Sequence, residues 1–212
     1  MKLINPVQNS RLLKYPYGQV YQSFGENIAL YMKAIGSAGH NGVNIVGEQA
    51  TPIIGTKGEV VEAKDNPKGY GKHIRIITPS DIGGDFYELV YGHLERLNVK
   101  IGQKIEDNHV IGYMGNTGFV ISINTPYWGN APVGKGVHLH FGVRECSTKD
   151  TGWQTTYSSG KKVYVKNYNN GLHGYINPLQ FIEVDTSTVQ AALGILTTIR
   201  KILLGMNWQL RK

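Results

Sequence analysis

Between Gly18 and Phe141, the apolar residues of this chain come mostly in short runs that glycine, asparagine, aspartate or proline interrupts. Apolar and polar side chains alternate within these runs, which is typical of strands joined by turns. The clearest runs are residues 59–63, 73–77, 87–91 and 138–143. The chain has 27 glycines among 212 residues, close to twice the usual share, which favours many tight turns. We therefore predict a mainly β protein built on an antiparallel β-sheet.

The pattern changes at Thr186. Apolar residues then recur every three or four positions, which places them on one face of a helix. They are Val189, Ala192, Leu193, Leu196, Ile199, Leu203, Met206 and Leu210. We predict a β-sheet domain over residues 1–184 and a C-terminal amphipathic helix over residues 185–212. Arg200 and Lys201 interrupt the apolar face, so packing on the domain, or on a second copy in self-association or assembly, is favoured over a membrane-surface role.

The distribution of charge argues against a nucleic-acid partner. The net charge is +7, but no acidic residue follows Asp185, and residues 1–185 carry 18 basic and 15 acidic side chains. That part of the chain has no basic run and no combined aromatic and basic motif of the RNA-binding kind. Attraction to an anionic polymer such as a cell wall is compatible with the charge.

Other features restrict the location and the chemistry. No run of about 18 apolar residues occurs, which predicts no transmembrane segment. Residues 1–6 lack the apolar stretch and the cleavage site of a secretory signal peptide. Cys146 is the only cysteine, which excludes an internal disulfide and a cysteine metal site and favours a small buried or bystander residue over a nucleophile. Residues 145–175 are polar and tyrosine-rich, which indicates a hairpin or a long surface loop.

Histidines supply the strongest signal of a site. His138 and His140 alternate with apolar residues in a predicted strand, so both imidazoles lie on one face. Two polar residues on a solvated face would show the same pattern. His40 and Asn44 are four residues apart beside Gly39 and Gly42, and this spacing brings them to the same side of an extended chain.

A further histidine, His93, ends a predicted strand, where its side chain reaches a cleft. Histidines from separate segments near one cleft favour a metal centre, because neutral imidazole suits zinc and catalytic zinc keeps a position open for water. We treat His73 in a strand, His109 in a turn, and His173 as structural or surface residues.

Ordered motifs over about residues 21–179 resemble the lysostaphin-type (LytM-type) zinc metallopeptidases, which are endopeptidases of bacterial peptidoglycan. The motifs are Phe24-Gly25-Glu26-Asn27, residues 39–45, Gly58-Glu59-Val60-Val61, residues 70–74, Tyr91-Gly92-His93-Leu94, residues 99–102, residues 111–118, His138-Leu139-His140-Phe141 and Ile176-Asn177-Pro178-Leu179. The resemblance implies the antiparallel fold of these peptidases, known as a duplicated hybrid motif.

The same resemblance implies a zinc ion bound by His40, Asn44 and His140, with His93 and His138 as an unliganded catalytic pair. One position departs from the family, which has aspartate where this chain has Asn44. A carboxamide oxygen is a weaker zinc ligand than a carboxylate. Residues 121–135 also form a longer segment than in the family, and its Tyr127 and Trp128 indicate either substrate contact or a packed loop.

The leading hypothesis is a zinc endopeptidase that hydrolyses peptide cross-links of peptidoglycan at the bacterial cell wall, as a phage lysin (endolysin) or a cell-wall hydrolase of the virion. The alternative is a catalytically disabled, peptidoglycan-binding or regulatory module in which Asn44 abolishes tight zinc binding. A third hypothesis is a structural sheet domain of a phage particle that assembles through the segment after Thr186.

Overall fold

The computed structural model describes residues 2–7, 20–80, 85–122 and 125–182. The helix that we predict over residues 185–212 lies outside these residues, as does the domain boundary at residue 184. Among the described helices, none is long and apolar enough to cross a membrane.

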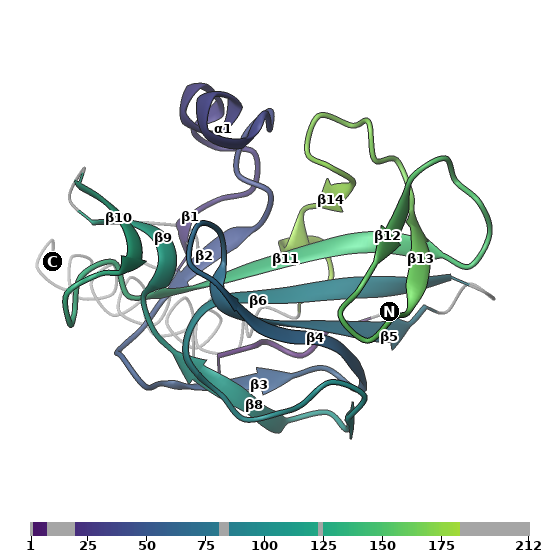
Figure 1. Cartoon of the computed structure of the whole chain (residues 1–212), viewed down its shortest axis with the longest axis horizontal. Helices are drawn as coiled ribbons and strands as arrows, with labels where there is room; N and C mark the ends of the chain where they lie inside the picture. The colour runs from purple at the N-terminus through teal and green to yellow at the C-terminus, as the bar shows by residue number, and fades with distance from the viewer. Residues whose placement is uncertain (1, 8–19, 81–84, 123–124, 183–212) are drawn as a thin grey trace, which may run out of the picture.

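Long antiparallel strands form the centre of the molecule (Figure 1). The elements are β1 (Val20–Gln22), α1 (Ile28–Ile35), β2 (Val43–Val46), β3 (Pro52–Gly55), β4 (Gly58–Asn66), β5 (Gly71–Pro79), β6 (Asp85–Leu97), β7 (Lys104–Ile105), β8 (His109–Met114), β9 (Thr117–Ser122), β10 (Thr125–Asn130), β11 (His138–Ser147), β12 (Gln154–Thr156), β13 (Lys162–Val165), β14 (Tyr175–Ile176) and a 3-10 helix, η1 (Pro178–Gln180). The main sheet has the order β1-β2-β11-β6-β5-β4-β7, and β9 and β10 form a separate hairpin.

The four alternating runs of the sequence fall within β4, β5, β6 and β11, which pair antiparallel to their neighbours. The prediction of a mainly β, antiparallel fold is therefore confirmed. Residues 145–175 contain the β12–β13 hairpin, so of the two structures proposed for this segment the hairpin is the one found.

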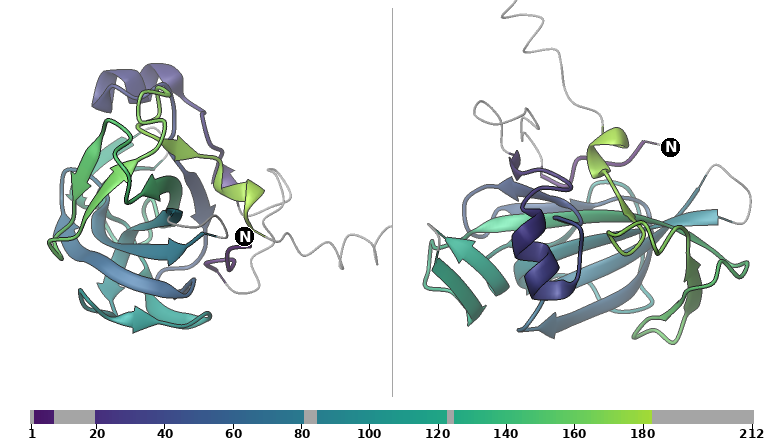
Figure 2. Two further views of the ribbon diagram at one scale, coloured as in Figure 1. Left: turned by 90° about the vertical axis from the view of Figure 1, so that its right-hand side faces the viewer. Right: turned by 90° about the horizontal axis from the view of Figure 1, so that it is seen from above.

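The two faces of the central sheet differ in character. One face supplies the larger apolar core, because alternate side chains of β5, β6 and β11 point into it. Its members include Ile74, Ile76, Leu89, Tyr91, Leu139, Phe141 and Val143. The opposite face carries polar side chains, and the β12–β13 hairpin covers part of it with a smaller apolar cluster around Tyr157, Val163 and Val165. Figure 2 shows this hairpin lying across the long strands.

Helix α1 was not predicted from the sequence. It ends at Gly36, whose φ of 67° lies in the left-handed region that glycine adopts without strain. Almost all of its residues are apolar although none is buried, and an apolar run of eight residues does not by itself distinguish a helix from a strand. The helix stands over the polar face of the sheet, beside β2 (Figure 1).

Candidate metal centre

Strand pairing brings the predicted ligand residues together. β2 and β11 pair antiparallel, and Asn44 lies directly opposite His140 in this ladder. His138 and His140 alternate along β11, so their imidazoles share the polar face. His40 lies in the turn before β2 and folds back toward the same point.

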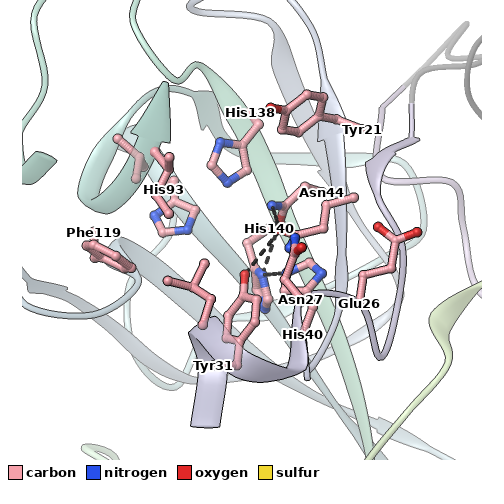
Figure 3. Close-up of a pocket in the computed structure, with 14 residues that line it drawn as sticks. Tyr21, Glu26, Asn27, Tyr31, His40, Asn44, His93, Phe119, His138 and His140 are labelled. Atoms are coloured by element: carbon pink, nitrogen blue, oxygen red, sulfur yellow. Dashed lines mark hydrogen bonds between the residues drawn. The ribbon is translucent and has the colours of Figure 1, made fainter. Parts of the chain in front are cut away.

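Three side-chain atoms converge there (Figure 3). The Nε2 atom of His40 lies 3.0 Å from Nδ1 of His140, and Oδ1 of Asn44 lies 3.3 Å from the same Nδ1. These three side chains are buried, with exposed fractions of 1%, 3% and 7% for His40, His140 and Asn44.

The protonation of His40 suits metal binding. Its Nδ1 lies 3.2 Å from the carbonyl oxygen of Ser23, which only accepts, so Nδ1 carries the proton and Nε2 keeps a lone pair. Burial lowers the pKa of His40 to about 3. Burial also holds the pKa of His140 well below its usual range, so both rings are neutral at pH 7.

The distances from His140 Nδ1 to the other two atoms fit a zinc ion. In a tetrahedral site with zinc–ligand bonds of about 2.0–2.1 Å, neighbouring ligand atoms lie roughly 3.3 Å apart. Binding of a metal to Nδ1 of His140 requires the ring proton to be on Nε2. Nε2 is buried and has no hydrogen-bond partner, so no existing hydrogen bond opposes this tautomer. No cluster of three or more His, Cys, Asp or Glu side chains in the described ranges is arranged to hold a metal. The candidate donor set is therefore two imidazoles and the Asn44 carboxamide.

His93 and His138 form a second pair beside these atoms, with ring centroids 4.6 Å apart. Nδ1 of His93 lies 2.8 Å from the carbonyl oxygen of Thr117, and Nδ1 of His138 lies 2.8 Å from that of Gly136. Each Nδ1 is therefore a donor, which leaves Nε2 as the free basic nitrogen. Burial lowers the pKa of His138 to about 4 and holds that of His93 well below its usual range.

The prediction that His93 ends a strand is wrong. It lies within β6, which continues to Leu97, and its φ of 62° is left-handed. The β5–β6 ladder shifts register around this point, between Lys72 and Ile74 of β5. The irregular backbone turns the His93 side chain toward His138 while β6 goes on.

A cavity of about 380 Å³ opens at these histidines. One wall is the β9 segment with Phe119, Val120 and Ile121, and the other is formed by β1 and α1 (Figure 3). Sequence reasoning missed several of its residues, among them Gln22 and Tyr31, because one lies in a very short strand and the other in the helix that was not predicted.

The other titratable candidates have separate environments. His73 is buried and contacts Gly71 and Glu62, so its role is structural as predicted. His109 was predicted in a turn, but it is the exposed first residue of β8. Cys146 is buried, and burial raises the pKa of its thiol to about 12, which is unfavourable for a nucleophile.

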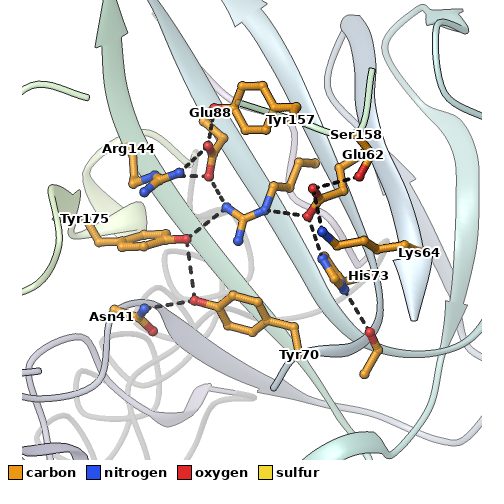
Figure 4. A network of polar contacts seen from close by, with 12 residues as sticks. Asn41, Glu62, Lys64, Tyr70, His73, Glu88, Arg144, Tyr157, Ser158 and Tyr175 are labelled. Carbon is orange, nitrogen blue, oxygen red and sulfur yellow. Dashed lines mark hydrogen bonds and ion pairs between the residues drawn. The ribbon is translucent and has the colours of Figure 1, made fainter. Parts of the chain in front are cut away.

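A ladder of charged side chains lies on the same sheet face (Figure 4). Glu62, Arg75, Glu88 and Arg144 come from the neighbouring strands β4, β5, β6 and β11. Arg75 Nε donates to Glu62 over 3.2 Å, and Arg144 Nε donates to Glu88 over 3.1 Å. Glu88 is fully buried and also accepts hydrogen bonds from Arg75 and the Tyr157 hydroxyl.

Two tyrosines join this charged ladder to the metal centre. Arg75 donates to the Tyr175 hydroxyl over 3.1 Å, and the Tyr70 hydroxyl donates to that of Tyr175 over 3.4 Å. The amide of Asn41, next to His40, donates to the Tyr70 hydroxyl over 2.8 Å. The Tyr70 ring lies 4.9 Å from the His140 ring, so it packs against a predicted ligand.

The neutral histidines make the metal-free protein sensitive to acid. In the unfolded chain these histidines bind protons below pH about 6.5, whereas the folded chain holds His138 neutral down to about 4 and His40 to about 3. The unfolded state therefore binds more protons as the pH falls through this range, and the free energy of unfolding decreases. Urea unfolding with a chelator, at about pH 7.5 and about pH 5, measures the effect.

A His138→Gln variant, which is neutral at every pH, should lose less stability over the same interval. Glu62 and Glu88, whose pKa values hydrogen bonds and arginine charges hold below the usual carboxyl range, contribute a loss of stability in the same direction, but mainly below pH about 4.5, where the carboxylates of the unfolded chain take up protons. Equal free energies of unfolding at the two pH values would contradict the expectation.

The part of the chain that carries this site matches a known protein family. Residues 38–151 match the family described as "Peptidase family M23". A segment of 112 residues is 29% identical to the glycyl-glycine endopeptidase ALE-1 of Staphylococcus capitis and covers 52% of this chain and 26% of that protein. Lysostaphin of Staphylococcus simulans is 30% identical over 112 residues, which cover 52% of this chain and 19% of lysostaphin.

These matches thus span about a quarter or less of the length of both relatives. Among solved structures, the catalytic domain of lysostaphin from Staphylococcus simulans aligns at 22% identity with a TM-score of 0.44. That alignment covers 69% of this chain and 80% of the lysostaphin domain.

Proposed function

The chain belongs to peptidase family M23, and we propose from this that it is a zinc-dependent endopeptidase that hydrolyses peptide cross-links of bacterial peptidoglycan. The observation that carries the proposal is the convergence of lone-pair atoms from His40, Asn44 and His140 beside the His93–His138 pair. Two relatives are named as a glycyl-glycine endopeptidase and as lysostaphin, and the first name supports a peptide substrate.

In this proposal His40, Asn44 and His140 hold the metal. Zinc bound in such a site lowers the pKa of water toward about 7 and polarises a carbonyl group. The rest of the chemistry falls to the protein's own side chains. His93 and His138 present Nε2 as a base, because each Nδ1 is bonded to a backbone carbonyl. One of them accepts the proton of the attacking water on Nε2 and, once protonated there, can donate a hydrogen bond to the oxyanion or pass the proton to the leaving amine.

Zinc content tests this proposal. The purified chain is loaded with zinc, dialysed and measured by elemental analysis beside His140→Ala. We expect about one zinc per chain in the natural sequence and none in the variant, because His140 contributes one of only three protein ligands. Absence of zinc from the natural chain would contradict a metal centre formed with Asn44.

Asn44→Asp separates the proposed enzyme from a disabled wall-binding module. The carboxylate adds a negative charge that favours zinc. We expect zinc affinity to rise by about 10- to 100-fold, which is the size of the affinity change usually caused by mutating residues that hydrogen-bond to metal ligands. Cleavage of purified peptidoglycan by both forms supports the enzyme. Cleavage by the Asp form alone, with wall binding by both, would favour the disabled module.

The place of action that we propose is the bacterial cell wall, and a phage lysin or virion component is the setting that we infer from the sequence. Lysis of intact cells by added protein tests the first part. A variant that lacks residues 186–212 tests the assembly role of the C-terminal segment. If the full chain and the variant have the same oligomeric state in solution, the segment does not mediate self-association.

A further inference from the structure

The carboxamide of Asn44 raises a problem of orientation that a carboxylate does not have. A carboxylate presents an oxygen to a metal whichever way it is rotated, whereas only one of the two terminal atoms of asparagine has a lone pair to give. With the side chain rotated by half a turn, Nδ2 would face His140 in place of Oδ1. A site that uses Asn44 as a ligand therefore needs something to fix its orientation.

Gln22 meets this need. Its Cα pairs with that of Asn44 in the β1–β2 ladder, so the two side chains are neighbours. Nδ2 of Asn44 donates to Oε1 of Gln22 over 2.9 Å, which leaves Oδ1 directed at Nδ1 of His140. Both amides are buried, with exposed fractions of 9% for Gln22 and 7% for Asn44, so water competes little for these contacts.

Tyr31 of α1 fixes Gln22 in turn. Its hydroxyl donates to the same Oε1 atom over 3.1 Å, so this oxygen accepts two hydrogen bonds from two different elements. Rotation of the Gln22 amide would place an NH2 group against Nδ2 of Asn44, which is also a donor. The contacts therefore run without a break from Tyr31 through Gln22 and Asn44 to His140. Figure 3 shows Tyr31, Asn44 and His140 around the cavity.

We propose that Gln22, held by Tyr31, is a positioning residue that turns the carboxamide oxygen of Asn44 toward the metal. The inference rests on the proposed zinc site and adds to it the reason why a neutral ligand is tolerated. In this proposal β1 and α1, which carry Gln22 and Tyr31, serve to orient the Asn44 side chain. It also predicts that Gln22 matters only while residue 44 is an amide.

The test compares Gln22→Met in two backgrounds, the natural chain and Asn44→Asp. Methionine keeps the unbranched length of glutamine but removes the acceptor. The readout is the dissociation constant for zinc, measured by competition with a chromogenic chelator. In the natural chain we expect zinc affinity to fall by about 10- to 100-fold, the usual effect of removing a partner that orients a metal ligand. In the Asn44→Asp background we expect a much smaller loss, because either carboxylate oxygen can bind.

Gln22→Glu in the natural chain provides the conservative variant. Its carboxylate accepts from Asn44 and Tyr31 but cannot donate, so it keeps the same orientation, and zinc affinity should stay at or above the natural value. Thermal unfolding of the metal-free variants reports any loss of folding separately. An equal loss in both backgrounds would show a general structural role and overturn the inference, as would unchanged affinity of Gln22→Met in the natural chain. If the natural chain binds no zinc while Asn44→Asp does, the proposed metal site with Asn44 fails instead.

Discussion

Replacement of His93 by asparagine should lower kcat for cross-link cleavage by about 10²- to 10⁴-fold, the usual contribution of a positioned acid or base, and should leave about one zinc per chain. His93 is not among the atoms that converge on His140 Nδ1, and its own Nδ1 is bonded to Thr117. Asparagine is a better substitute than alanine, because the φ of residue 93 is 62° and asparagine tolerates the left-handed region as histidine does. The loss then reports the missing imidazole and not backbone strain.

Steady-state kinetics on purified peptidoglycan, with zinc content measured on the same samples, check this expectation. His109→Asn is the matched control, because it makes the same substitution at the exposed start of β8 and should leave kcat unchanged. Loss of zinc from the His93→Asn protein would place His93 among the ligands and overturn the division of roles between His93 and His140.

The second large effect concerns stability. Glu88→Gln should lower the free energy of unfolding by about 3–5 kcal/mol, the usual cost of breaking a buried ion pair by removing one partner. The Glu88 carboxylate is fully buried and accepts from Arg75, Arg144 and Tyr157. Glutamine has the same shape but no charge, so the guanidinium groups of the partly buried Arg75 and the buried Arg144 would lose their shared counter-charge.

Urea unfolding at neutral pH measures this loss. Glu106→Gln is the control, since Glu106 pairs with Lys57 over 3.0 Å where both side chains are more than half exposed. Exposed pairs of this kind contribute about 0–1 kcal/mol. Similar losses for the two variants would contradict the role that we assign to burial.

The sequence predicts the strands better than the contacts between them. Alternation identifies β4, β5, β6 and β11, because each has one face in an apolar core and such strands keep a period of two. Helix α1 escapes the same reasoning, because it is eight residues long and almost wholly apolar, and so short an apolar run does not distinguish a helix from a strand. The predicted helix over residues 185–212 stays a prediction, because it lies outside the described residues.

The candidate site divides in the same way. His138 and His140 are two positions apart on one strand, so their shared face follows from the sequence. Gln22 acts through a residue on another strand, and no local spacing signals such a contact. The charged ladder is also hidden, because Glu62, Arg75 and Glu88 have the pattern of strands with a solvated face. The β12–β13 hairpin, with Tyr157 against Glu88, turns part of that face into an interior.

Strand β11 carries His138, His140 and Arg144 at alternate positions on the same face. Adding or removing one residue within β11, between His140 and Arg144, would move the residues on one side of the change to the opposite face, because side-chain direction reverses at each step. The proposed zinc ligand His140 and Arg144, the partner of Glu88, would then lie on opposite faces, and one of the two contacts would be lost. We therefore expect insertions and deletions in the connections at the two ends of β11 and not within the strand.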